Sequence, residues 1–251
     1  MSKNRKRFSK KSFLAKVLWG CFFVIFFLSA GYGLMELMDS RSFQLFGEIV
    51  NLVETEEKVV ALTFDDGPTD NTAEVLDILE AAGIKATFFL TGREMEGLPA
   101  ETERIVKAGH EIGNHSYSHK RMIFKPPGFI KDEVNRTDKF IREAGYLGDI
   151  SFRPPYGKKL FFLPRFLSRN DRKTIMWNIE PDSYPEVASD SQAIIEHVKE
   201  KIEPGSIILL HVMYDQNVTS RNAIAGLVET LEAKDYSFVT VSELLAHSEE
   251  D

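Results

Sequence analysis

Hydrophobic and polar positions divide the chain into two regions with different patterns. Val17 to Met35 is a run of nineteen residues without a single charge. From Lys58 onward, short apolar runs alternate with amphipathic stretches. This alternation is typical of strands and helices that follow one another in a parallel α/β architecture. The pattern therefore predicts one apolar N-terminal helix followed by an α/β domain.

Seven short runs are predicted to be strands, because they are apolar or partly β-branched and are bounded by turn residues. They are Val59–Phe64, Ala86–Leu90, Glu111–Asn114, Ile150–Phe152, Thr174–Trp177, Ser206–Leu210 and Phe238–Val239. The helices predicted between them are Thr72–Ala82, Pro99–Ala108, Pro127–Ala144, Asp190–Ile202 and Arg221–Ala233. No strand is followed by a glycine-rich phosphate loop, so seven parallel strands favour barrel-like closure over a nucleotide-binding sheet.

The apolar run at residues 17–35 is predicted to be a transmembrane anchor. At about 1.5 Å per residue it nearly spans a hydrocarbon core about 30 Å thick. A basic tail, residues 1–16, precedes it, so the positive-inside rule keeps the N-terminus in the cytoplasm and exports the remainder. The main alternative is a cleaved signal peptide and a secreted domain, although Leu28-Ser29-Ala30 is a weak cleavage site. Lipidation of Cys21 is disfavoured, because the apolar run continues past it.

Charge and cysteine usage narrow the function of the exported part. Seven of the 31 basic residues and none of the 38 acidic residues lie before residue 36, so residues 36–251 carry a net charge of −14. Nucleic acid is therefore not an expected partner, since its phosphates bind Lys and Arg. The single cysteine lies in the apolar run, which excludes a disulfide scaffold and a thiolate nucleophile from the exported part. Residues 36–57 are predicted to form a short juxtamembrane stem.

Side chains with catalytic chemistry directly follow four of the predicted strands. Asp65 and Asp66 end the first strand, and Gly67-Pro68 then forces a turn. His115, Arg153 and His211 each follow a later strand. In parallel barrels the active site lies at the carboxyl ends of the strands. Because neighbouring side chains at a strand end point different ways, one of the two carboxylates can ligate a metal while the other acts as a base.

His115 and His119 stand four positions apart. If this turn were helical, their Cβ atoms would lie about 5–6 Å apart, close enough to share an ion. Together with Asp66 they supply two neutral nitrogens and one carboxylate, and they leave the open position that a catalytic divalent-metal site requires. Zn²⁺ suits this ligand set best, and Co²⁺, Fe²⁺, Mn²⁺ and Ni²⁺ are also admitted.

Arg153 and His211 have distinct candidate roles. Arg153 opens the rigid loop Arg153-Pro154-Pro155-Tyr156-Gly157 and could hold a carboxylate through two parallel hydrogen bonds. His211 follows a buried strand, and as a catalytic group it would be a general acid near neutral pH. The sequence contexts of His110, His197 and His247 are helical or terminal, and these histidines are expected to be structural or surface residues.

Four ordered motifs resemble those of the polysaccharide deacetylases, the NodB-homology family of carbohydrate esterases. The motifs are Thr63-Phe64-Asp65-Asp66-Gly67-Pro68, His115-Ser116-Tyr117-Ser118-His119, Arg153-Pro154-Pro155-Tyr156-Gly157 and Ile208-Leu209-Leu210-His211. The resemblance covers residues 58–246, with 247–251 as a tail. It implies a distorted (β/α) barrel and metal-dependent removal of acetyl groups from carbohydrate polymers. By position it implies Asp66, His115 and His119 as metal ligands, Asp65 as general base, Arg153 as the residue that holds this base, the Tyr156 backbone N–H as oxyanion donor, Leu209 as a wall of the acetyl pocket, and His211 as general acid.

One motif departs from the family's pattern. The family usually has Asp-x-x-Asp-Trp after the position of Trp177, where an Asp partners the catalytic His and the Trp lines the substrate groove. Here Glu180, Ser183 and Tyr184 stand at those three positions. Asp182, one position early, could still reach His211. We therefore expect Asp182 to be the partner of His211 and Tyr184 to line the groove.

These residues imply an enzyme that deacetylates N-acetylated cell-envelope glycan. Peptidoglycan N-acetylglucosamine or N-acetylmuramic acid is the favoured substrate, because the anchor places the domain beside the wall. Chitooligosaccharides and poly-N-acetylglucosamine are alternatives within the same chemistry. A non-catalytic glycan-binding domain and a metallo-phosphoesterase are alternatives from other classes. The first is disfavoured by the intact candidate residues, and the second by the lack of a second metal-ligand cluster in the sequence.

Overall fold

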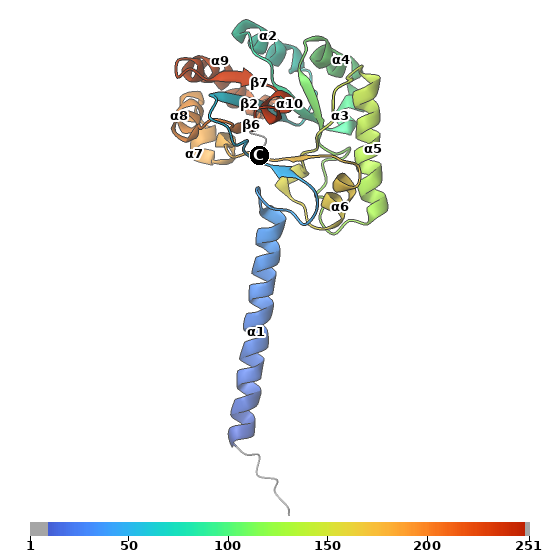
Figure 1. Ribbon diagram of the computed structural model, residues 1–251, viewed down its shortest axis with the longest axis vertical. Coiled ribbons are helices and arrows are strands. Elements are labelled where there is room, and N and C mark those ends of the chain that lie inside the picture. The colour runs from blue at the N-terminus through green and yellow to red at the C-terminus, as the bar shows by residue number, and fades with distance from the viewer. Residues whose placement is uncertain (1–9, 249–251) are drawn as a thin grey trace, which may run out of the picture.

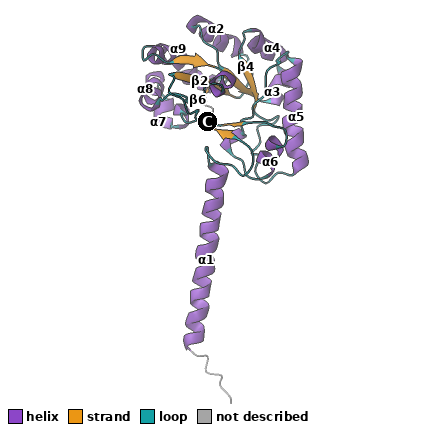
Figure 2. Ribbon diagram, in the orientation of Figure 1, coloured by secondary structure: helices purple, strands orange, loops and turns teal. Residues whose placement is uncertain are grey.

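The computed structural model describes residues 10–248 as one long helix joined to a barrel domain. Helix α1 (Lys10–Asp39) projects from the domain, and its segment Phe13–Asp39 is long and apolar enough to cross a membrane. The domain sits at the C-terminal end of this helix (Figure 1, Figure 2). Residues 1–9 of the predicted basic tail, and residues 249–251 of the predicted C-terminal tail, lie outside the described residues.

Seven strands of the described chain form the barrel. They are β1 (Ile49–Val50), β2 (Val59–Asp65), β3 (Thr87–Leu90), β4 (Glu111–Asn114), β5 (Thr174–Ile175), β6 (Ile207–His211) and β7 (Ser237–Val239). Every ladder pairing is parallel, and β2 pairs with β3, β6 and, at its amino end, β7. Parallel bridges Asn114↔Phe152, Phe152↔Thr174 and Ile179↔Ile208 continue from β4 round to β6. The predicted distorted barrel of parallel strands is confirmed.

The strand assignment needs two corrections. Residues 150–152 form no strand, and only Phe152 makes β-bridges to its neighbours. The two prolines that follow Arg153 explain this, since proline has no N–H with which to continue a ladder. Strand β1 was not predicted, and it lies in the segment expected to be a juxtamembrane stem. This segment lies against the domain: β1 pairs with β5, and Gln44 and Val53 are buried.

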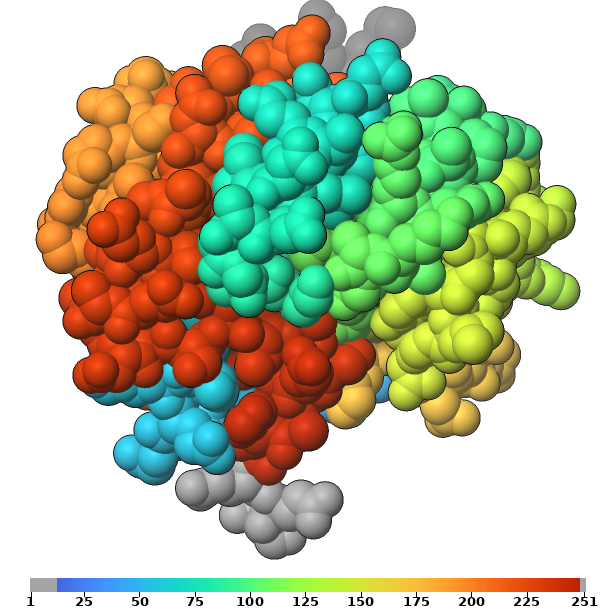
Figure 3. Space-filling view, turned by 90° about the horizontal axis from the view of Figure 1, so that it is seen from above, coloured from blue at the N-terminus to red at the C-terminus, as the bar shows by residue number. Residues whose placement is uncertain are grey.

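Helices surround the barrel and cover the end farthest from α1. Their bounds are α2 (Thr72–Ala82), α3 (Gly92–Gly97), α4 (Pro99–Lys107), α5 (Pro127–Glu143), α6 (Phe162–Ser168), α7 (Pro185–Ala188), α8 (Ser191–Lys201), α9 (Val218–Glu232) and α10 (Val241–Leu245). The five predicted helices correspond to α2, α4, α5, α8 and α9. The other four within the domain are too short to show a helical period. Seen from above, α2, α4 and α9 form much of the surface opposite α1 (Figure 3).

Alternation along β2 sets the direction of its functional side chains. All seven residues of β2 are buried. Val60, Leu62 and Phe64 pack into the cluster beneath the outer helices, whereas Ala61 belongs to the cluster that includes Leu209 and Trp177. Because successive side chains on a strand point to opposite faces, Thr63 and Asp65 share the side of Ala61. Asp65 is therefore delivered to the inside of the barrel, at the carboxyl end of its central strand.

Candidate metal centre and active site

Seven of the ten predicted site residues line one cleft of about 530 Å³ at the carboxyl end of the barrel. It is lined by Asp65, Asp66, His115, His119, Tyr156, Leu209 and His211, among others. Asp66 follows directly after β2 and has a φ of 70°. This left-handed conformation is uncommon for a residue with a side chain. It interrupts the alternation of the strand, so both adjacent carboxylates reach the same cleft.

Asp66, His115 and His119 form a cluster that fits a divalent metal ion. Their potential ligand atoms all lie within 4.8 Å of one another. Asp66 Oδ1 lies 3.4 Å from His119 Nε2 and 4.0 Å from His115 Nε2. This oxygen is buried and accepts no hydrogen bond from the described residues. A buried carboxylate oxygen without a donor is costly, and a cation at this position would remove that cost.

The two imidazoles are prepared for metal binding by their surroundings. His115 Nδ1 lies 2.8 Å from the carbonyl oxygen of Arg153. A ring N–H at Nδ1 donates to this carbonyl, which leaves the lone pair of Nε2 free for an ion. Burial, and next the nearby His115, lower the pKa of His119, and the charges of Asp66 and Asp65 oppose this only in part. Both features suit metal binding, because Nε2 of His115 is left as the free ligand atom and the lowered pKa favours the neutral form of His119.

A loop, rather than a helical turn, brings the two histidines together. Ser116 and His119 have φ values of 64° and 53°, so the helical condition for their meeting is not met. The ring centroids of His115 and His119 nevertheless lie 4.9 Å apart. The Ser118 N–H and hydroxyl donate to the Glu133 carboxylate at 2.8 and 2.7 Å, which ties the loop to α5. Glu133 was not identified from the sequence, since an acidic residue on a helix carries no distinguishing signal.

Arg153 holds Asp65 inside the barrel. Its side chain is fully buried, and Nη1 donates to Asp65 Oδ1 at 2.7 Å and to Thr63 Oγ1 at 2.8 Å. The remaining donors bind the carbonyl oxygens of Met176 and Ile175. The expected pair of parallel bonds to one carboxylate is therefore wrong, because two of the three guanidinium nitrogens bind the backbone. Burial raises the pKa of Asp65, but the electrostatic effects of Arg153, His115 and His211 lower it by more, so the net pKa is below its usual range.

Asp182 lies beside His211, as expected from its position in the altered motif. The His211 backbone N–H donates to Asp182 Oδ2 at 2.6 Å, and His211 Nδ1 lies 3.4 Å from Asp182 Oδ1. Burial lowers the pKa of His211, but the hydrogen bond and charge of Asp182, with the charges of Asp65 and Asp66, raise it to about 9. His211 therefore carries a proton at neutral pH.

The three predicted substrate-binding residues have different placements. Leu209 is buried in β6 and lines the cleft, and Tyr156 also lines it, with its ring 4.7 Å from that of His119. Tyr184 does not line the cleft. Its ring lies 5.2 Å from that of His197, on α8, and the Lys201 ammonium lies 5.4 Å from the centroid of the same ring. The expectation that Tyr184 lines the groove is wrong, because its side chain packs on α8 while the neighbouring Ser183 lines the cleft.

Four charged residues outside the predicted site set also line the cleft: Asp39, Arg41, Lys158 and Glu180. Arg41 donates to Glu180 Oε2 at 2.6 Å, and its guanidinium lies 4.7 Å from the ring centroid of Trp177. The same Glu180 oxygen accepts the indole N–H of Trp177 at 2.8 Å. Arg41 and Glu180 are 139 positions apart, so no local pattern could have paired them.

The remaining histidines lie away from the cleft. His110 is buried, accepts the backbone N–H of Ala86 at 3.2 Å, and has its pKa lowered to about 4 by burial and by Lys85. It is therefore a neutral structural residue. His197 contacts Tyr184, and His247 lies 3.3 Å from Glu57. The expectation that these three are structural or surface residues agrees with their placement.

Several known proteins are similar to this chain in sequence. The family model described as "Polysaccharide deacetylase" matches residues 52–166. A peptidoglycan-N-acetylglucosamine deacetylase of Bacillus cereus is 31% identical over 196 residues, which cover 78% of this chain and 92% of that protein. A peptidoglycan-N-acetylmuramic acid deacetylase of Bacillus subtilis, PdaC, is 31% identical over 193 residues, which cover 76% of this chain and 40% of that protein.

Two solved structures with a similar fold differ in activity: one is a deacetylase and the other is described as a pseudoenzyme. The Bc1960 peptidoglycan N-acetylglucosamine deacetylase superposes with a TM-score of 0.74 and 28% identity, over 80% of this chain and 94% of that one. A protein of Bacillus anthracis, described as a pseudoenzyme of the CE4 family, superposes with a TM-score of 0.71 and 27% identity, over 80% of this chain and 69% of that one. The fold therefore occurs in both enzymes and a pseudoenzyme, and activity must be argued from the residues of the cleft.

Proposed function

Because the chain belongs to the polysaccharide deacetylase family of hydrolases, we propose that it removes N-acetyl groups from a glycan of the cell envelope. The observation that carries this proposal is the meeting of Asp65, Asp66, His115, His119 and His211 in one cleft. Peptidoglycan is the favoured glycan, since relatives named for both of its amino sugars match this chain. Chitooligosaccharides and poly-N-acetylglucosamine are alternatives within the same chemistry.

Asp66, His115 and His119 would hold the metal ion, with Zn²⁺ favoured and Co²⁺, Mn²⁺, Fe²⁺ or Ni²⁺ admitted by the same ligands. A divalent ion at this site supplies Lewis-acid chemistry, which polarises the acetyl carbonyl and lowers the pKa of water. Asp65 faces the same cleft with a lowered pKa, held in place by Arg153. Asp65 is therefore ionised at neutral pH, as a general base must be.

The reaction needs two proton transfers, one by Asp65 and one by His211. Asp65 takes a proton from water as the water oxygen bonds to the acetyl carbon. The Tyr156 backbone N–H donates to the negative oxygen that develops on this carbon. His211, positioned by Asp182, then gives its proton to the departing nitrogen as the C–N bond breaks. The products are acetate and a primary amine on the sugar.

A non-catalytic glycan-binding domain is the second candidate, because one structural neighbour is described as a pseudoenzyme. The arrangement in this cleft favours catalysis. The buried Asp66 Oδ1 lacks a hydrogen-bond donor among the described residues, and an ionised Asp65 and a protonated His211 face the same space. A glycan-binding surface would gain nothing from these costly groups.

The test of the proposed function measures metal content and amine release on the same sample. We expect the purified full chain to bind one divalent ion and to release amines from N-acetylglucosamine oligomers or peptidoglycan. The substitution His119→Ala should abolish both, because it removes one of three ligands. His247→Ala, outside the cleft, is the matched control and should retain both. Full metal occupancy in His119→Ala would refute the ligand assignment, and metal binding without any amine release would indicate the glycan-binding alternative.

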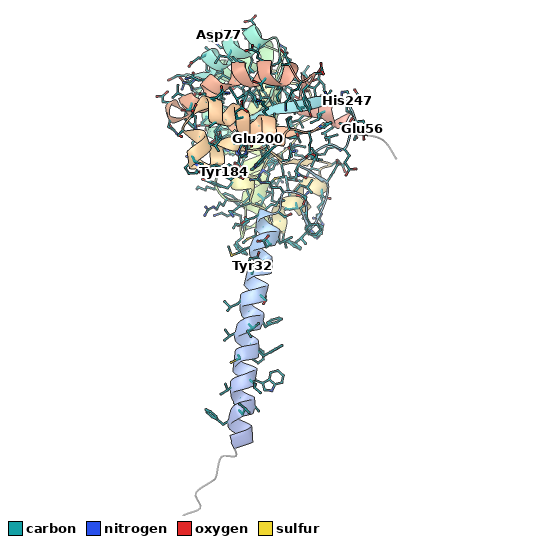
Figure 4. All side chains as sticks on the ribbon, turned by 90° about the vertical axis from the view of Figure 1, so that its left-hand side faces the viewer. Tyr32, Glu56, Asp77, Tyr184, Glu200 and His247 are labelled. Atoms are coloured by element: carbon teal, nitrogen blue, oxygen red, sulfur yellow. The ribbon has the colours of Figure 1, made fainter. Side chains whose placement is uncertain are left out.

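A second prediction concerns the pH profile. His211 acts as an acid, so activity should fall as pH rises through its pKa of about 9. Asp182→Asn removes the hydrogen bond and charge that raise this pKa, while the opposing effect of burial remains. The alkaline limb should therefore move down from about pH 9 toward the ordinary value of 6.5. Asp77→Asn, at the end of the domain opposite α1 (Figure 4), should leave the profile unchanged. An unmoved alkaline limb in Asp182→Asn would contradict the assigned pairing.

We further propose that α1 anchors the domain to the membrane, with the catalytic domain outside the cytoplasm. The support is the uncharged run at residues 17–35, its basic N-terminal flank, and the exposure of the α1 side chains from Phe13 to Glu36. Secretion after cleavage remains the alternative, since a signal sequence has the same length and composition.

A further inference from the structure

The C-terminal end of α1 is fixed to the rim of the cleft. Lys158 forms an ion pair with Asp39, the last residue of α1. The Lys159 backbone N–H donates to the Met38 carbonyl at 3.2 Å, and its ammonium binds the Ser40 carbonyl. The last carbonyls of a helix lack partners within it and carry partial negative charge, so two lysines here stabilise the helix end. The helix therefore joins the domain through direct contacts.

This junction sets the distance between the cleft and the membrane. The uncharged run ends at Met35, and Asp39 follows four residues later, a rise of about 6 Å along the helix. The headgroup layer adds roughly 5–7 Å on each side of the hydrocarbon core. Asp39 itself lines the cleft. If α1 spans the bilayer as proposed, the rim of the cleft lies at the outer edge of the headgroups.

Exposed apolar side chains gather around this junction. Phe43 and Leu45 follow α1 directly and are 56% and 41% exposed, and Phe161 and Phe162 are 41% and 42% exposed. The rings of Phe46 and Phe161 lie 5.1 Å apart, which links the two segments. Helix α6, which begins at Phe162, lies beside the upper end of α1 (Figure 1). We call Phe43, Leu45, Phe161 and Phe162 the proximal face.

Basic side chains lie near the proximal face and the cleft. The Arg165 guanidinium lies 5.7 Å from the ring of Phe46 and 6.0 Å from that of Phe161, and Arg121 lies 5.1 Å from the ring of Tyr156, which lines the cleft. Two acidic residues nearby are paired with cations, Asp39 with Lys158 and Glu180 with Arg41. A domain with a net charge of −14 would otherwise be repelled by anionic lipid. Aromatic rings with adjacent Arg are the side chains that favour the membrane interface.

We propose that the proximal face rests on anionic lipid headgroups and holds the mouth of the cleft at the membrane surface. Aromatic and aliphatic side chains enter the interface, and Arg121 and Arg165 attract the headgroup phosphates. The substrate is then N-acetylated glycan that lies next to the bilayer, such as chains still attached to it, rather than glycan deeper in the wall. This inference rests on the proposed deacetylase function and anchor, and it specifies which substrate pool they serve.

Site-directed probes on the full chain test the contact. Cys21 is the only cysteine, so Cys21→Ser gives a background for single labels at Phe162→Cys and Asp77→Cys. Asp77 lies at the end of the domain farthest from α1 (Figure 4). Each labelled chain is reconstituted in vesicles of phosphatidylcholine and phosphatidylglycerol. Fluorescence quenching is then measured with iodide in water and with bromine on the lipid chains.

The expected result is opposite behaviour at the two positions. The probe at position 162 should be quenched by brominated lipid and shielded several-fold from iodide, and the probe at 77 should show the reverse. Equal access of iodide to both probes would overturn the proposal, as would shielding that persists in detergent, which would indicate a second copy or a protein partner. Failure of the chain to float with the vesicles would overturn the proposal as well, because it would show that α1 does not anchor the domain to the membrane. Quenching does not depend on catalysis, so a failed deacetylase assignment is recognised separately.

An activity comparison tests the substrate pool. Phe162→Ser should slow deacetylation of a lipid-linked N-acetylglucosamine oligomer in the same vesicles several-fold, with no change toward the soluble oligomer. Leu147→Ser is the matched control, since Leu147 is an apolar residue that is 90% exposed. It follows the end of α5, and a helix of a parallel barrel ends near the amino ends of the strands, away from the cleft. Leu147→Ser should change neither rate. Equal rates of Phe162→Ser and the unsubstituted chain on the lipid-linked oligomer would overturn the proposed role of the face.

Discussion

Replacing Asp65 with Asn is expected to lower the rate of deacetylation about 10²–10⁴-fold, or roughly 3–5 kcal/mol of barrier, while the metal content stays unchanged. Asn keeps the shape of the side chain and can still accept the Arg153 hydrogen bond, but it cannot take a proton from water. Asp65 lies outside the cluster of Asp66, His115 and His119 whose ligand atoms lie within 4.8 Å of one another. The loss should therefore appear in turnover rather than in metal binding.

Asp66→Asn is the matched comparison, because it makes the same chemical change one residue later. It should weaken metal binding, since a neutral amide is a poorer ligand than a carboxylate. Metal analysis and turnover measured over pH separate the two variants. The acid limb of the profile should vanish in Asp65→Asn, while the alkaline limb set by His211 should remain in any residual activity. If Asp65→Asn loses the ion and Asp66→Asn keeps it, the two roles are reversed.

Arg153→Met is expected to destabilise the domain by about 3–5 kcal/mol, the cost of leaving one partner of a buried ion pair uncompensated. Arg153 is fully buried, and its bond to Asp65 is 2.7 Å long. The free energy of unfolding can be obtained from urea titrations with a chelator present, so that no ion compensates Asp65. Trp177 reports on the barrel once Trp19, the only other tryptophan, is replaced by Phe.

Two further variants show whether the lost partner causes this effect. Adding Asp65→Asn to Arg153→Met should restore part of the stability, because no unpaired buried carboxylate then remains. Arg172→Met removes a less buried pair, with Asp138 at 2.7 Å and side-chain exposures of 16% and 22%, and it should cost less. Strictly additive losses in the double variant would show that Arg153 stabilises the barrel through its backbone and ring contacts instead.

Local patterns in the sequence predicted most of the strands and helices of the fold. The apolar runs that became β2, β3, β4 and β6 are recognisable because a buried parallel strand needs apolar residues on both faces. The longer helices carry a repeating apolar face. The predictions were wrong or missing where an element is very short, as at β1 and α7, or where prolines end a ladder, as after Arg153. Such segments contain too few residues to show a period.

The sequence by itself determined the chemistry available to this protein. Adjacent carboxylates, two histidines four positions apart, and an arginine and a histidine that each follow a strand are all visible in the chain. They are visible because parallel strands place their carboxyl ends at one edge, so residues there have a predictable neighbourhood.

Only the tertiary structure decided which of these groups meet. The two metal-cluster histidines approach each other through left-handed loop residues. Asp182 reaches His211 from one position before the one where the family has its Asp, while Tyr184 packs on α8. Asp39 and Arg41 join the cleft although they precede the domain's central strand. These contacts depend on distances across many residues of folded chain. Periodicity and spacing encode burial and local geometry, and they contain no information about such distances.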